Sequence, residues 1–229
     1  MSAPGRPVSV KPLAITAFSM VSALGCGRAA HLQALLAARS GLVETDFESA
    51  ALGTWLGLVE GLDERPLPAA LAAFECRNNR LAEMALQADG FGAQVEAAAA
   101  RYGARRVGVF LGTSTSGILQ TEIAYRHRDP VSGALPASLN YSQTHNSYAV
   151  GHYVRAALGL QGPAFVVSTA CSSSAKVFAA AQRLIALSVI DAAVVGGVDS
   201  LCMTTLYGFK SLSCCPATSA APGTPTARA

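Results

Sequence analysis

The stretch Gly162-Pro-Ala-Phe-Val-Val-Ser-Thr-Ala-Cys171-Ser-Ser-Ser-Ala-Lys-Val-Phe-Ala-Ala-Ala181 indicates the fold class of this chain. Its first part, residues 163–168, is a short apolar run typical of a strand buried on both faces. The alanine-rich run over residues 172–188 predicts a helix. Between them lies a group of small residues around Cys171. A strand that passes directly into a helix is the repeating unit of an α/β protein.

Strands and helices alternate over the rest of the sequence as well. Further strands are predicted at residues 8–18, 107–111 and 192–198, and the second of these opens into a Gly112–Gly117 loop. Further helices are predicted at residues 28–38, at 77–101 with a break near 90–92, at 118–126 and at 146–158. Residues 42–75 and 127–145 are predicted to be irregular. This order favours an α/β fold with a largely parallel sheet.

The composition excludes several classes of protein. Of the 229 residues, 51% are hydrophobic and 14% are charged, against a usual charged share of about 25%. The longest apolar stretches contain charged residues, so none reaches the roughly 18 residues of a membrane-spanning helix. The net charge of +3 is spread without a basic run, so we expect neither nucleic acid nor membrane as a partner.

The six cysteines favour reduced thiols in the cytoplasm. No pair has the Cys-x2-Cys spacing of a zinc site, and no histidine pair supplies complementary ligands, so no metal site is predicted. The segment that ends Ala23-Leu24-Gly25-Cys26 has a slight similarity to a lipoprotein signal. Because Pro12 and several hydroxyl residues interrupt its apolar run, it reads equally well as a strand and turn.

Cys171 is the candidate nucleophile. A helix N-terminus carries unpaired N–H groups and about half a positive charge, which favour a thiolate over a thiol. Small neighbours would let another molecule approach the sulfur. The alternative is a buried structural cysteine, since cysteine is among the most buried residue types.

The string Ser168-Thr-Ala-Cys-Ser-Ser-Ser174, followed by Asp191-Ala-Ala-Val-Val-Gly-Gly-Val-Asp-Ser200, resembles the active-site region of the β-ketoacyl-[acyl carrier protein] synthases. Other stretches agree with that family in the same order. They are residues 8–27, the Gly112–Gly117 loop, Asn146-Ser-Tyr-Ala-Val-Gly151 and Gly208-Phe-Lys-Ser-Leu212. The resemblance covers residues 8–212.

This resemblance implies a thiolase-like fold with αβαβα layers made of two similar halves, of which residues 8–212 form the first, N-terminal half. Cys171 would accept an acyl group as a thioester, and the enzyme would catalyse decarboxylative Claisen condensation with a malonyl-carrier protein. No cofactor is expected, since such substrates arrive on the phosphopantetheine of acyl carrier protein. The implied partners are acyl carrier protein and either a second copy of the chain or a ketosynthase partner chain.

The resemblance also implies roles for residues outside the cysteine loop. The candidate substrate-binding residues are Gly112, Thr113, Ile118, Tyr148 and Ala149. Arg77 and Arg80 lie where relatives carry basic residues that meet the acidic carrier protein. The alternative for the candidate substrate-binding residues is ordinary core and turn packing. The alternative for the two arginines is that they lie on a solvated helix face. His145 and His152 receive no role, because the family's catalytic histidines lie elsewhere.

No stretch of the sequence matches the family's catalytic histidines, its lysine or its Gly-Phe-Gly loop. Residues 213–229 contain no Leu, Ile, Val or aromatic residue, so we predict disorder there and in residues 1–7. Reading one base back across Cys214-Cys215 forces Leu at the second position. If mostly GC-rich third bases are chosen, residues 216–226 can then be read as a stretch that resembles the continuation of a ketosynthase. A frameshift near Ser213 is therefore our interpretation of the tail.

Two function hypotheses follow. The chain is either a ketosynthase first half that is inactive alone, or a non-catalytic partner subunit similar to a chain length factor. The presence of Cys171 favours the first, since those factors typically lack the nucleophile. An α/β hydrolase is excluded because Gly112–Gly117 does not have the Gly-x-Ser-x-Gly spacing. A nucleotide-binding module is excluded because the sequence has no glycine-rich phosphate loop with the required spacing.

Overall fold

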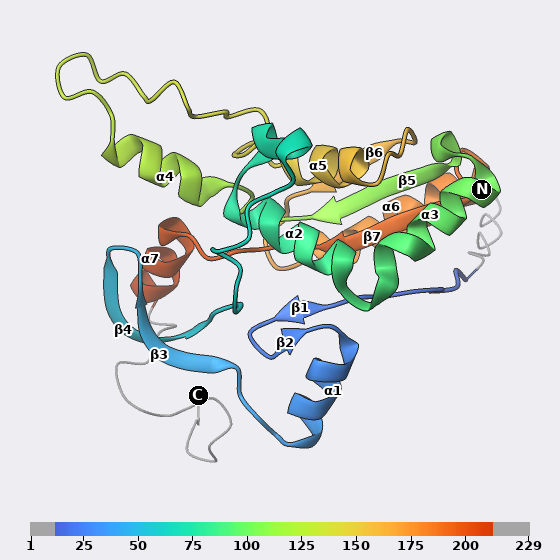
Figure 1. Cartoon of the computed structure of the whole chain (residues 1–229), viewed down its shortest axis with the longest axis horizontal. Coiled ribbons are helices and arrows are strands. Elements are labelled where there is room, and N and C mark those ends of the chain that lie inside the picture. Colours follow the sequence, from blue (N-terminus) through green and yellow to red (C-terminus); the bar gives the residue numbers. More distant parts are fainter. Residues whose placement is uncertain (1–11, 213–229) are drawn as a thin grey trace, which may run out of the picture.

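A three-stranded parallel sheet forms the centre of the protein. The computed structural model describes residues 12–212, so the predicted disorder in 1–7 and the predicted frameshifted tail at 213–229 lie outside the described residues. The central strand β5 (Val107–Gly112) pairs with β6 (Ala164–Val167) on one side and β7 (Ala192–Gly197) on the other (Figure 1). Every residue of β5 is buried. The predicted parallel α/β sheet is therefore confirmed.

Helices cover both faces of this sheet. Helix α6 (Ser173–Ala186) connects β6 to β7 and packs on one face, where Phe110 and Val177 share a core with Ala181 and Ile190. On the other face, Val109 and Leu111 contact a larger core. That core includes residues of α2 (Arg77–Gln87), α3 (Phe91–Tyr102) and α5 (Ala149–Ala157). Successive side chains of β5 thus enter different cores, as expected for a strand that is covered on both faces.

The predicted helices form close to their expected bounds. The break inside the long helical run is a 3-10 turn over Ala88–Gly90, where Asp89 and Gly90 have left-handed φ values of 57° and 68°. Helix α4 (Ile118–Arg126) spans the residues predicted for it. The polar loop after α4 extends away from the body, as Figure 1 shows for the yellow-green segment.

A hairpin and a helix correct the sequence prediction. Residues 42–75 were expected to be irregular, but β3 (Leu42–Phe47) and β4 (Ala50–Gly57) form an antiparallel pair, and Ala69–Phe74 forms a 3-10 helix. The unpredicted helix α7 (Met203–Ser211) follows β7. The apolar residues of the hairpin, α4 and α7 share one small core: Phe47, Ala50, Leu56, Leu119, Cys202, Met203 and Leu206.

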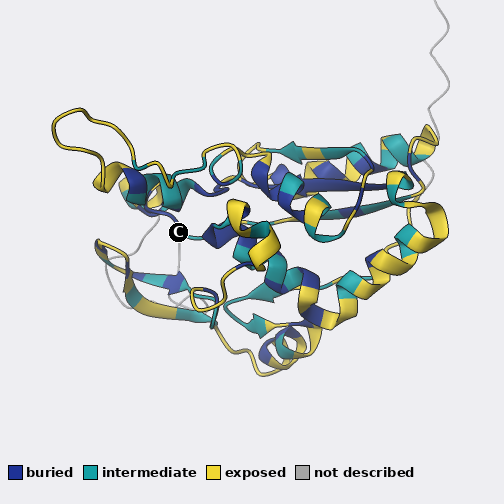
Figure 2. Cartoon of the chain, turned by 45° about the horizontal axis from the view of Figure 1, so that its top comes forward, coloured by how far each residue is buried: buried dark blue, intermediate teal, exposed yellow. Residues whose placement is uncertain are grey.

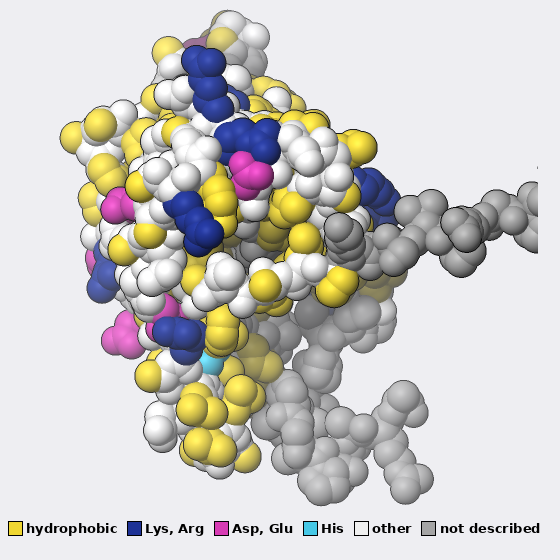
Figure 3. All heavy atoms as spheres, turned by 90° about the vertical axis from the view of Figure 1, so that its right-hand side faces the viewer, with side chains coloured by type: hydrophobic (Ala, Val, Ile, Leu, Met, Phe, Trp, Pro, Cys, Tyr) yellow, Lys and Arg dark blue, Asp and Glu magenta, His cyan; other side chains and the backbone are white. Residues whose placement is uncertain are grey.

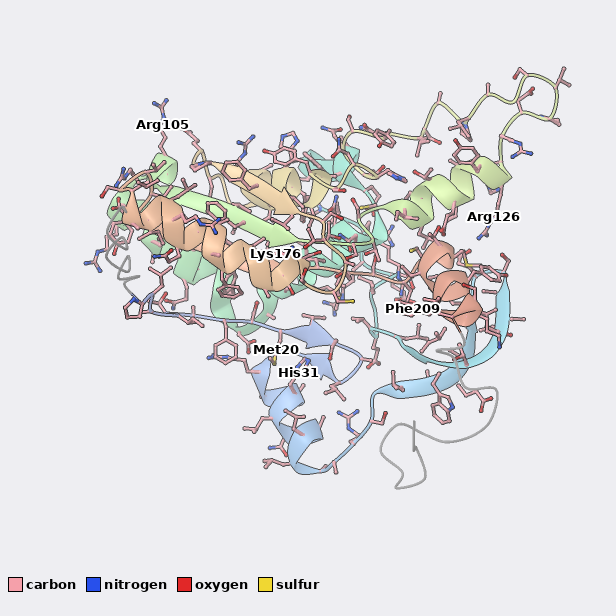
Figure 4. The ribbon with its side chains drawn as sticks, turned by 180° about the vertical axis from the view of Figure 1, so that it is seen from behind. Met20, His31, Arg105, Arg126, Lys176 and Phe209 are labelled. Atoms are coloured by element: carbon pink, nitrogen blue, oxygen red, sulfur yellow. The ribbon has the colours of Figure 1, made fainter. Side chains whose placement is uncertain are left out.

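The N-terminal segment also departs from the prediction. A strand was expected over residues 8–18, yet residues 12–18 form none, and Ile15 is 74% exposed. Only the short strands β1 (Val21–Ser22) and β2 (Gly25–Cys26) follow, before helix α1 (Arg28–Leu36). Figure 4 shows Met20 and His31 in this small unit. Within residues 12–212 the outer edge of β7 is unpaired, and residues 12–18 do not pair with it.

Apolar side chains reach the surface at several places. On and beside α6, Phe178 is half-exposed and Leu187 is 71% exposed, and on β6 Phe165 is half-exposed. Figure 2 shows exposed residues, in yellow, on the outer helices and loops. Figure 3 shows hydrophobic side chains between the charged ones on one face of the molecule. An exposed apolar area of this kind is typical of a surface that another protein segment covers.

Candidate functional site

The candidate site lies at the carboxyl ends of the three parallel strands. Strand β6 ends at Val167, and α6 begins at Ser173. Cys171 lies in the sharp turn between them and is exposed, so it occupies the predicted strand–helix junction and is not a buried structural cysteine. The preceding residue, Ala170, has a left-handed φ of 51°. In Figure 4, Lys176 marks the first turns of the helix that follows.

Hydrogen bonds within the turn hold this conformation. The Ser173 hydroxyl accepts a hydrogen bond from the Thr169 N–H at 2.9 Å and donates one to the Ala170 carbonyl at 2.6 Å. The Ser172 hydroxyl donates to the Thr169 carbonyl at 2.9 Å. A non-glycine residue with a left-handed backbone costs about 1–3 kcal/mol, so these bonds offset backbone strain beside Cys171.

Two glycines bring the start of α6 against the sheet. A Cβ atom on Gly112, at the end of β5, would lie 2.4 Å from the Ser174 nitrogen. A Cβ atom on Gly197, at the end of β7, would lie 2.5 Å from the Ser174 Cβ. The first turn of α6 therefore sits directly on the ends of both strands. Gly112, a predicted substrate-binding residue, takes part in this close packing, and substrate binding by it stays a prediction.

The loop after β5 is tied to the loop after β7. One carboxylate oxygen of Asp199 accepts hydrogen bonds from the N–H groups of Ser114 at 2.6 Å and Thr115 at 3.1 Å. The hydroxyls of Thr113 and Thr115 donate to the same oxygen at 3.3 and 3.2 Å. The predicted substrate-binding residue Thr113 is fully buried in this network. Sequence reasoning assigned no role to Asp199, although an acidic residue directly after the strand predicted at residues 192–198 was a usable signal.

The same loop contacts the segment before α5. The Ser116 hydroxyl donates to the carbonyls of Thr144 and Asn146 at 3.1 and 2.9 Å. The Asn146 side chain in turn accepts from the Tyr148 N–H at 2.9 Å. Tyr148 is partly exposed and Ala149 is fully buried. The structure thus links these two candidate residues to the 113–117 loop, and substrate binding by them stays a prediction.

The two candidate docking arginines are engaged inside the protein. Arg77 is buried, forms an ion pair with Asp63 and lies over the ring of Phe47. Arg80 forms an ion pair with Glu75 and is partly exposed. Arg77 is therefore not on a solvated helix face, whereas Arg80 retains an accessible side chain. Carrier-protein docking stays a prediction.

Burial and hydrogen bonding account for the surroundings of three further titratable side chains, Cys76, Tyr153 and His145. Burial raises the pKa of the Cys76 thiol to about 11. Burial and the hydrogen bond that Tyr153 donates to Glu83 raise the pKa of this tyrosine far above its usual range. His145 is hydrogen bonded to Thr121 at 2.7 Å.

The described residues were also compared with the requirements of a metal site and of a membrane-spanning helix. Within residues 12–212, no group of three His, Cys, Asp or Glu side chains is arranged to hold a metal ion. No helix over these residues combines the length and apolar character needed to span a membrane.

Comparison with known proteins places the chain in a family. The family model described as β-ketoacyl synthase, N-terminal domain, matches residues 71–222. The chain belongs to the β-ketoacyl synthase family. Its parallel sheet with helices on both faces is the N-terminal part of the thiolase-like fold.

Solved structures of ketosynthases agree with this assignment. The ketosynthase ApeO in complex with its chain length factor ApeC from Xenorhabdus doucetiae matches with 31% identity and a TM-score of 0.75, over 89% of this chain and 51% of that chain. The ishigamide ketosynthase/chain length factor has the same fold, with 19% identity, a TM-score of 0.63, and coverage of 86% and 49%. The chain thus spans about half the length of the structures it matches. Comparison with curated proteins gives no match.

Proposed function

We propose that this chain provides the N-terminal part of a β-ketoacyl-[acyl carrier protein] synthase and that Cys171 is its acyl acceptor. The observation that carries the proposal is the exposed thiol in a strained turn between β6 and α6. Strained backbone is concentrated at functional sites, where it fixes the direction of a reacting group. Membership of the β-ketoacyl synthase family supports the same role.

In the proposed reaction, the Cys171 thiolate attacks the carbonyl carbon of an acyl group carried on the phosphopantetheine of acyl carrier protein. A new carbon–sulfur bond forms and the thioester bond to the carrier breaks. The carrier sulfur leaves as a thiolate and takes up the proton that the Cys171 thiol released. The chain needs no cofactor of its own for this step. Exposure of the sulfur and the small side chains around it allow a thioester to approach.

Condensation with a malonyl-carrier protein needs more than the nucleophile. Decarboxylation generates an enolate, and donors aimed at its oxygen supply much of the rate enhancement in such reactions. The chain corresponds to about half of the matched ketosynthase structures. We therefore propose that condensation requires the other half of such an enzyme, and that the exposed apolar area around α6 contacts further ketosynthase sequence or a partner chain. The reaction would take place in the cytoplasm, in fatty acid, polyketide or aryl polyene synthesis.

A second candidate function is that of a chain-length-factor-like partner. The matched structures contain a ketosynthase and a chain length factor, which keeps this alternative open. A partner of this type would bind a ketosynthase without forming an acyl-enzyme. Cys171 favours the catalytic proposal over this one.

Intact-mass measurement after incubation with an acyl-carrier protein tests the proposal. We expect an acyl adduct on the 229-residue chain that maps to Cys171, is lost in Cys171→Ala and is retained in Cys26→Ala. Cys26 is the matched control because it is also a free, exposed thiol. An adduct that persists in Cys171→Ala would refute the assignment. The absence of an adduct, together with tight binding to a ketosynthase, would establish the partner function instead.

A further inference from the structure

Asp199 lies at a junction of the three loops that form the candidate site. It follows β7 by two residues, and its Oδ1 accepts two backbone and two hydroxyl hydrogen bonds from the loop after β5. The shortest is the 2.6 Å bond from the Ser114 N–H. Hydrogen bonds to an ionised acceptor are roughly twice as strong as those between neutral groups. One carboxylate therefore holds residues 113–115 in place.

The loop that Asp199 holds also contacts the cysteine turn. The Ser114 hydroxyl donates a hydrogen bond to the Ala170 carbonyl at 3.1 Å. Ala170 is the left-handed residue directly before Cys171, and its carbonyl also accepts from the Ser173 hydroxyl. The Ser114 bond is thus an external constraint on the strained residue that directs the Cys171 side chain.

A third contact reinforces the junction. The Thr115 hydroxyl accepts the N–H of Ser200 at 3.0 Å, so the loop and the residues around Asp199 bind each other in both directions. The hydroxyl of Thr115 also lies 3.5 Å from the buried Asn78 side chain of α2. The junction therefore rests on the protein core and not only on exposed loops.

We propose that Asp199 is a positioning residue for Cys171, acting through Ser114 on the carbonyl of Ala170. This inference rests on the proposed role of Cys171 as the acyl acceptor. Without the Asp199 carboxylate, the 113–115 loop loses its anchor and the Ser114 hydroxyl no longer holds Ala170. The turn then relaxes its left-handed residue, and the direction of the Cys171 side chain is no longer fixed.

Alkylation kinetics of the full 229-residue chain test this proposal. Iodoacetamide is the probe, and peptide mapping gives the rate at Cys171 divided by the rate at Cys26 in the same molecule. The variants are Ser114→Ala, Asp199→Ala, the double variant, and Asp199→Asn, which keeps an oxygen acceptor but removes the charge. Asp191→Ala is the matched control, because it removes an exposed carboxylate at the opposite end of β7.

We expect Ser114→Ala and Asp199→Ala each to lower the rate ratio about threefold or more, because a relaxed turn no longer presents the Cys171 thiol to the reagent in one fixed orientation. The double variant should fall no lower than Asp199→Ala, since residues on one path are not additive. Asp199→Asn should recover part of the ratio, because its amide oxygen still accepts hydrogen bonds from the 113–115 loop but more weakly than a carboxylate does. Asp191→Ala should leave the ratio unchanged.

Three results would overturn the proposal: an unchanged ratio in Ser114→Ala, an additive double variant, or equal effects of Asp199→Asn and Asp199→Ala. The last would mean that charge, and not position, connects Asp199 to the thiol. If Asp199→Ala does not fold, Ser114→Ala still decides, because it removes a single hydroxyl from an exposed residue. Because the probe is iodoacetamide, failure of acyl transfer from a carrier protein refutes the proposed function without affecting this result.

Discussion

Replacing Gly112 by alanine should destabilise the protein at the cysteine turn. The new Cβ would lie 2.4 Å from the Ser174 nitrogen and 2.5 Å from the Ser173 carbonyl carbon, both of which are backbone atoms. Contact at about 3.5 Å is the optimum for such atoms, so the start of α6 must move by roughly 1 Å. Inserting a methyl group into a packed site costs about 1–3 kcal/mol.

Thermal unfolding measures this cost. For a chain of this size, each kcal/mol shifts the unfolding midpoint by about 2–4 °C, so we expect Gly112→Ala to lower it by about 2–12 °C. The matched control is Gly208→Ala in α7, where an added Cβ meets no atom within 4 Å. This control should stabilise by about 0.5–1 kcal/mol, because alanine loses less conformational entropy than glycine in a helix. Equal midpoints for the two variants would refute the argument that α6 rests on the end of β5.

Three further predictions concern single side chains. Iodoacetamide at neutral pH should label exposed Cys171 and leave Cys76 unlabelled in the folded chain, because burial raises the pKa of Cys76 to about 11; equal labelling by peptide mapping would contradict this. Burial and Glu83 raise the pKa of Tyr153 in the folded chain, so this side chain should contribute fully to stability below about pH 10. Above about pH 10 the tyrosine of the unfolded chain ionises, and the contribution should decline. Tyr153→Phe should remove this decline from the unfolding free energy. Glu122→Ala should lower the unfolding free energy by about 1 kcal/mol, because this carboxylate accepts hydrogen bonds from the first N–H groups of α7 at 2.7 and 2.8 Å. Denaturant unfolding measures the change, and an unchanged value would show that α7 needs no cap.

The sequence predicted the central sheet and the cysteine turn because these depend on local patterns. A strand covered on both faces is a continuous apolar run, and β5 is one. The turn was predicted from adjacent residues as well, namely the small residues around Cys171 and the alanine-rich helix after it. The β3–β4 hairpin was missed because its turn places Glu48 in the left-handed region, with φ of 53°, and contains no Gly or Asn.

Other features depend on which segments meet in space. Residues 12–18 are rich in residues that favour strands, but local sequence does not say whether a segment pairs with the edge of a sheet. The burial of Arg77 follows from Asp63 and Phe47, which sequence reasoning does not place beside it. The role of Asp199 requires β5 and β7 to be neighbours, although the residues it joins are separated by 85 positions.

The sequence separation between the parts of this site has a consequence for folding kinetics. The Ser114–Ala170 bond spans 56 positions and the Ser114–Asp199 bond spans 85, so both close long loops. Contacts of high sequence separation form slowly, because loop-closure entropy is lost before they contribute energy. The turn around Cys171 should therefore reach its final geometry only after β5, β6 and β7 have assembled. In a folding experiment, protection of the turn amides should then appear later than protection of helices α2 and α3.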